Sequence, residues 1–69
     1  MKQVITNDIF ATALRRARAE FLEMPGLTLT VVQAARLWQS DSVLCKAVLA
    51  RLVEQRFLVE TRHHSFARA

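Results

Sequence analysis

The sequence has few of the residues that break helices or cross-link a chain. Its 69 residues include one glycine, one proline and one cysteine, and no tyrosine. A lone cysteine excludes a disulfide within the chain and fits a reducing compartment. So little glycine and proline leaves no material for long loops, which favours one compact, helix-rich domain. A domain of this length buries only about 60 % of its unfolded surface, so it is a poor host for a catalytic cleft. We therefore do not expect an enzyme.

Long apolar runs are also absent. No run approaches the roughly 20 residues that span a bilayer, and the first ten residues lack the apolar region of a signal peptide. We therefore expect a cytoplasmic protein with no membrane partner. The net charge of +4 is spread as +1, +2 and +1 over residues 1–26, 27–56 and 57–69, without a block of Lys or Arg. This charge permits attraction to phosphates but does not require it.

Apolar residues at helical spacing predict three helices. The first covers about 8–24, capped by Thr6 or Asn7 and ended by Pro25. The second covers about 31–38 and opens with a capping box made by Thr30 and Gln33. The third covers about 42–55 and starts at Asp41 or Ser42, with Cys45 at the centre of its apolar face.

Short β-rich segments surround the second and third helices. Leu27–Leu29 alternates like a strand but is only a stub, whereas Phe57–Thr61 and Ser65–Arg68 predict a hairpin over about 57–68. The fold class is therefore α+β, mainly helical. We expect a single domain over residues 1–69 with a C-terminal β-hairpin wing.

The run from residue 27 to residue 68 carries a family pattern. Its elements are Leu-Thr-Leu-Thr at 27–30, Gln-Ala-Ala-Arg-Leu at 33–37, Cys-Lys-Ala-Val-Leu at 45–49, Leu-Val at 52–53, Phe-Leu at 57–58, and Phe66 with Arg68. This run resembles the winged helix-turn-helix domains of small bacterial DNA-binding regulators. The resemblance implies a bacterial or phage transcriptional regulator that places its third helix in the major groove of double-stranded DNA and its wing on the backbone.

Two positions depart from that pattern. Arg56 stands where glycine usually joins the third helix to the wing, and Arg62-His63-His64-Ser65 replaces a tip that often contains glycine. Arg56 must then adopt a positive φ at a cost of about 1 kcal/mol, or the junction bends differently.

The outward face of the third helix and the wing tip supply the candidate DNA contacts. Lys46 and Arg51 suit phosphates or guanine edges, and small Val43 and Ala47 allow close approach. Ser42 lies near the helix N-terminus, where backbone amides favour phosphate. The wing tip contributes contacts to the backbone. The full predicted set is Ser42, Val43, Lys46, Ala47, Arg51, Arg62, His63 and His64.

The same helix face supports an alternative function. Val43, Ala47 and Ala50 offer few hydrogen-bonding groups and stand beside acidic Glu54, which suits a protein-interaction module without intrinsic DNA binding. Because one domain this small binds DNA weakly, we also expect a larger partner or a homodimer. The dimer surface would be the first helix, including Leu22.

The sequence contains no motif for binding a cofactor or a metal. Cys45 is expected to be a buried core thiol, and adjacent His63 and His64 would face opposite sides of a strand and could not chelate one metal. No cofactor is expected. Trp38 should close the second helix as a core residue whose indole N–H donates to a carbonyl or to water.

Overall fold

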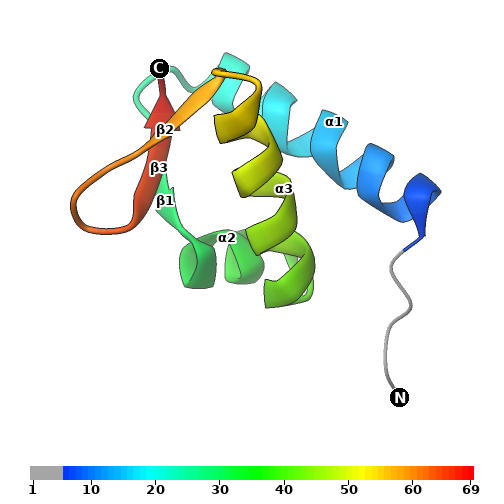
Figure 1. Cartoon of the computed structure of the whole chain (residues 1–69). Helices are drawn as coiled ribbons and strands as arrows, with labels where there is room; N and C mark the ends of the chain where they lie inside the picture. Colours follow the sequence, from blue (N-terminus) through cyan, green and yellow to red (C-terminus); the bar gives the residue numbers. More distant parts are fainter. Residues whose placement is uncertain (1–5) are drawn as a thin grey trace.

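A computed structural model describes residues 6–69, in which three helices and three short strands follow in the order α1, β1, α2, α3, β2, β3 (Figure 1). Their bounds are α1 Asn7–Glu23, β1 Thr28–Thr30, α2 Val31–Trp38, α3 Ser42–Glu54, β2 Leu58–Glu60 and β3 Ser65–Arg68. The expected α+β, mainly helical class is confirmed, and the layout is compatible with a winged helix. Relative to the approximate predicted ranges, α1 begins and ends one residue earlier and α3 ends one residue earlier. β2 is shorter than the predicted Phe57–Thr61, whereas β3 has the predicted range.

Side-chain caps begin each helix. Thr6 Oγ1 accepts from the Ile9 amide at 3.2 Å at the start of α1. At α2, Thr30 Oγ1 accepts from the Gln33 amide at 3.1 Å, while Gln33 Oε1 accepts from the Thr30 amide at 2.9 Å. The predicted capping box is therefore confirmed. Asp41 caps α3 by accepting from the Val43 amide at 2.7 Å.

The sheet is antiparallel, with strand order β1-β3-β2. The segment expected to be an isolated stub is a full partner in it, one residue later than predicted. Leu29 of β1 lies opposite Phe66 of β3, and both side chains are buried. This apolar cross-strand pair explains why three residues suffice to add a strand.

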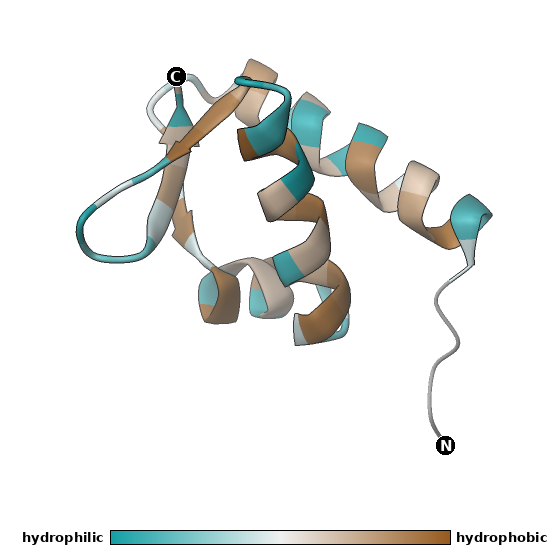
Figure 2. Cartoon of the chain, in the orientation of Figure 1, coloured by the Kyte–Doolittle hydropathy of each residue, from teal (hydrophilic) through white to brown (hydrophobic). Residues whose placement is uncertain are grey.

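The core surrounds α3, which packs on α1, α2 and β2. Its buried members are Ala17, Phe21, Leu29, Ala34, Trp38, Leu44, Cys45, Val48, Leu49, Leu52, Leu58 and Phe66. Cys45 is a core residue, as predicted. Hydrophilic residues gather in the hairpin loop and at the C-terminal end of α3 (Figure 2).

Two residues around the hairpin have a left-handed backbone. Arg56, at the junction with α3, has φ 61°, and His64, near the tip, has φ 58°. Of the two alternatives left open for Arg56, the structure has the positive φ, and His64 adopts the same region at the tip. For residues with a Cβ this conformation costs about 1–2 kcal/mol each.

Candidate nucleic-acid interface

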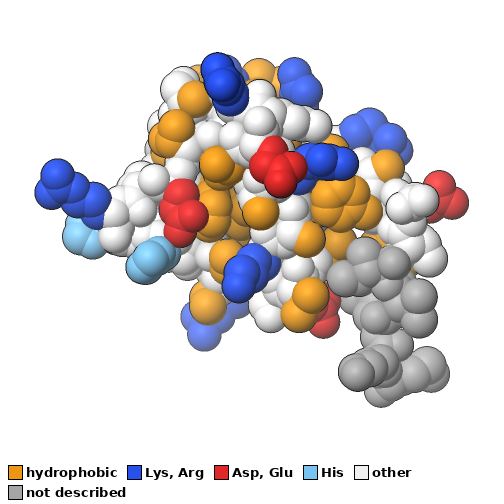
Figure 3. Space-filling view, viewed as in Figure 1, with side chains coloured by type: hydrophobic (Ala, Val, Ile, Leu, Met, Phe, Trp, Pro, Cys, Tyr) orange, Lys and Arg blue, Asp and Glu red, His pale blue; other side chains and the backbone are white. Residues whose placement is uncertain are grey.

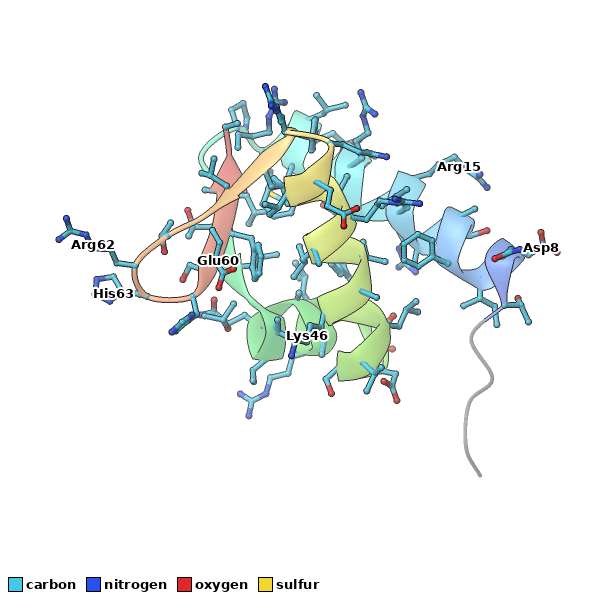
Figure 4. All side chains as sticks on the ribbon, viewed as in Figure 1. Asp8, Arg15, Lys46, Glu60, Arg62 and His63 are labelled. Carbon is cyan, nitrogen blue, oxygen red and sulfur yellow. The ribbon has the colours of Figure 1, made fainter. Side chains whose placement is uncertain are left out.

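The predicted DNA contacts lie on two exposed segments. Ser42, Val43, Lys46 and Ala47 belong to the first half of α3, and Arg51 follows one turn later. The other segment is the hairpin tip, residues 61–64, which joins β2 to β3. Figure 4 shows Lys46 on α3 and Arg62 with His63 at the far end of the hairpin loop, with Glu60 between these two points.

The first half of α3 offers one clear cationic contact. Lys46 is exposed and forms no ion pair with any residue in the range 6–69. Ser42 is less favourable, because the Asp41 carboxylate already occupies the helix N-terminus through its 2.7 Å bond to the Val43 amide. A phosphate at Ser42 would therefore meet a negative charge. The role of Ser42 stays a prediction.

Arg51 is engaged within its own helix. Its Nη1 lies 3.3 Å from Glu54 Oε2, and the two side chains are 53 % and 69 % exposed. An ion pair this exposed contributes at most about 1 kcal/mol, so the guanidinium is free to exchange partners. As the pair stands, however, it adds no net positive charge to this face.

Thr61 organises the hairpin tip. Its Oγ1 accepts from the amides of His63 and Ser65 at 3.3 Å each, and its backbone amide donates to Ser65 O at 2.7 Å. Sequence reasoning missed Thr61, although a threonine at the end of a strand is a known turn-forming signal. The tip is therefore a fixed turn that presents Arg62 and His63 to solvent.

The two tip histidines differ in orientation. His64 Nδ1 lies 3.1 Å from Glu60 Oε2, while His63 is exposed without an ion pair among the described residues. Both lie in the turn before β3, between the two hairpin strands, as predicted. His63 is thus the histidine left available for an outside contact.

Charges on this face balance. Cationic Lys46, Arg51 and Arg62 are matched in number by Asp41, Glu54 and Glu60. Figure 3 shows acidic and cationic side chains interspersed among hydrophobic ones on this face. The interface is therefore close to neutral, with positive groups at separate points.

An apolar strip runs along the same face. Val43 is 66 % exposed, the highest value among the large hydrophobic side chains of residues 6–69. Ala47 and Ala50 are exposed further along α3. We call these three residues the α3 strip. Val59 of β2 is also 46 % exposed, but it faces away from buried Leu58 and so from the side of β2 that packs on α3.

Phe57, at the base of the hairpin, contacts arginine side chains from α1 and from β3. The guanidinium of Arg18 lies 4.9 Å from the centre of the Phe57 ring, and that of Arg68 lies 4.3 Å from it. Phe57 O also accepts from the Ala69 amide at 3.1 Å. No spacing in the sequence links Arg18 to Phe57. These contacts join α1 to the hairpin and steady the tip.

Groups suited to metal or nucleophilic chemistry are sparse. Within residues 6–69, no three His, Cys, Asp or Glu side chains cluster as a metal site would require. Burial raises the pKa of the Cys45 thiol above its ordinary value of 9.0, and the negative charge of Asp41 adds to this effect. The thiol is therefore protonated at neutral pH and unsuited to nucleophilic attack.

Comparison with known proteins gave no match: no family model, no curated protein and no solved structure is similar to this chain. None of the helices in residues 6–69 has both the length and the apolar character needed to cross a membrane.

Proposed function

We propose that this chain is a winged-helix protein that binds double-stranded DNA and acts as a small bacterial or phage transcriptional regulator. The observation that carries the proposal is an exposed cation at each of two points, Lys46 on α3 and Arg62 on the hairpin that follows α3. Neither forms an ion pair within the described range. Two such points suit a duplex, with α3 in the major groove and the wing on the backbone.

The α3 strip supports close approach in this arrangement. Alanine at positions 47 and 50 leaves room for the groove wall, and the methyl groups of Val43 suit contact with thymine methyls. Arg51 joins the contacts when it exchanges Glu54 for a phosphate, at the small cost of an exposed ion pair. His63 at the tip adds a hydrogen bond to the backbone.

Binding by one copy should be weak. Each phosphate contact contributes about −0.9 to the slope of log K against log salt concentration, so Lys46 and Arg62 together predict a slope of about −2. A homodimer would double these contacts. The surface proposed for it is α1, where Leu22 is 53 % exposed.

The test is a salt titration of binding to a random duplex, measured by fluorescence anisotropy. Lys46→Gln with Arg62→Gln should lower affinity at least tenfold at low salt and flatten the slope by about 2. A charge-matched control is Arg15→Gln with Arg16→Gln on α1, which should change binding far less. Absence of binding at low salt, or equal losses in both double variants, would sink the proposal.

A protein-interaction module is the second candidate. It is favoured by the equal numbers of acidic and basic residues counted on the interface and by the 66 % exposure of Val43. Its occupant would be an amphipathic helix whose apolar side covers the α3 strip. Helical peptides selected from a display library on the wild-type protein should lose binding to Val43→Asp but not to Leu22→Asp. Equal binding to both variants would exclude the strip as their site.

A further inference from the structure

A cavity of about 320 Å³ lies between the first half of α1 and the corner where α2 meets α3. Ile9 and Ala13 line it from α1, and Trp38, Leu44 and Val48 line it from the opposite side. None of the predicted DNA contacts borders it. Its volume falls at the lower end of the range of about 300–1,000 Å³ that small-molecule sites occupy.

The walls of this cavity are firm and apolar. Trp38, Leu44 and Val48 are at most 8 % exposed and belong to the core, and Ile9 and Ala13 pack against that core from α1. Cys45 also lines the cavity, and its thiol, which is neutral at physiological pH, adds a weakly polar surface. An apolar body fits between these walls, because it removes apolar surface from water on both sides.

The orientation of the Trp38 side chain is set by packing rather than by a hydrogen bond. Its Nε1 is buried and has no partner within residues 6–69, so the expected carbonyl acceptor is absent. A buried donor without a partner costs about 1–3 kcal/mol.

The two charged residues that border the cavity differ in how their charge is compensated. Asp8 and Arg16 are eight residues apart on α1, which corresponds to about 12 Å along the helix axis. Asp8 lies in the first turn, where the amides at the helix N-terminus favour its negative charge. Arg16 is exposed and forms no ion pair with a described residue. The uncompensated charge at this cavity is thus the guanidinium.

We propose that this cavity binds a small apolar carboxylate of one or two rings, with its body between α1 and α3 and its carboxylate on Arg16. A guanidinium donates two parallel hydrogen bonds to a carboxylate, which fixes the orientation of the molecule. A partner helix is about 10–12 Å across with its side chains, too wide to enter this space as a whole. This site is independent of the proposed DNA interface.

The probe is 1-naphthoate, compared with its uncharged amide. The chain has one tryptophan, so the single indole N–H resonance in a ¹H–¹⁵N spectrum reports from the cavity wall. Naphthoate should shift this resonance to saturation and raise the melting temperature. Arg16→Gln should weaken naphthoate at least tenfold without affecting the amide. Its matched control is the neighbour Arg15→Gln, which does not line the cavity and should bind like the wild type.

A second pair of variants tests the location. Ala13→Phe places a ring inside the cavity and should abolish the shift, whereas Ala19→Phe, at an exposed position of α1, should not. If Ala13→Phe fails to fold, the Arg16→Gln comparison still decides. Three results would overturn the proposal: no indole shift at millimolar naphthoate, equal affinity of wild type and Arg16→Gln, or a wild-type dimer that Ala13→Phe converts to monomer.

Discussion

The buried and exposed faces of α3 differ in polarity and in what lies against them. Leu44, Val48 and Leu49 belong to a buried face made only of apolar residues. Exposed Val43 and Ala47 instead share their face with polar and charged side chains. One face of α3 is buried because α1, α2 and β2 pack against it. The other side keeps apolar residues without a covering element, which is the property expected of a recognition surface.

The largest effect should come from the buried face. Leu49→Ala removes a side chain that is 0 % exposed and should lower the free energy of unfolding by about 2–5 kcal/mol. In a domain this small, that loss should leave much of the chain unfolded at 37 °C. Urea unfolding followed by circular dichroism measures it. Ala50→Ser, on the adjacent exposed position, should change stability by less than about 0.5 kcal/mol; equal effects would contradict the division into faces.

A smaller effect should come from the exposed face and appear in binding alone. Ala47→Glu adds a fourth carboxylate to a face that already has Asp41, Glu54 and Glu60, and it should lower affinity for a random duplex about tenfold, or about 1.4 kcal/mol. Its urea midpoint should stay near that of the wild type. Ala19→Glu on α1 is the control for added charge. Unchanged DNA affinity in Ala47→Glu would mean that α3 does not meet the duplex.

The smallest effect concerns Cys45, the ionisable residue of the buried face. Because burial and then Asp41 raise its thiol pKa in the folded state, folding favours the protonated form. This contribution is complete below pH 9.0, the ordinary thiol pKa, and declines as pH rises through the higher folded value. Stability should therefore fall as the pH rises above 9.0 in urea titrations. Cys45→Ala should lose stability less steeply over this range, and identical slopes would refute the assignment.

Local signals were sufficient to predict much of the fold. The order of the elements and the capping box at α2 depend on neighbouring residues, and both appear in the structure. The addition of β1 to the sheet could not be predicted in this way. It depends on Leu29 meeting Phe66, a contact between distant segments that no local periodicity encodes.

The candidate site shows the same division between features that local sequence predicts and features that depend on contacts between distant segments. Exposure of Lys46 on α3 follows from helical spacing, and the Arg51–Glu54 pair is visible as a three-residue interval. The stacking of Arg18 and Arg68 on Phe57 and the cavity beside Trp38 join separate segments. Both require the angle between α1 and α3, which packing sets after the helices have formed.

The strand order has a consequence for synthesis on the ribosome. Both ladders of the sheet pass through β3, yet β3 is the last of the six elements to be translated. β1 and β2 must therefore emerge unpaired, exposing backbone donors and acceptors until residues 65–68 follow. A chain clipped before Ser65 loses every strand pairing at once. Formation of the whole sheet therefore waits for residues 65–68.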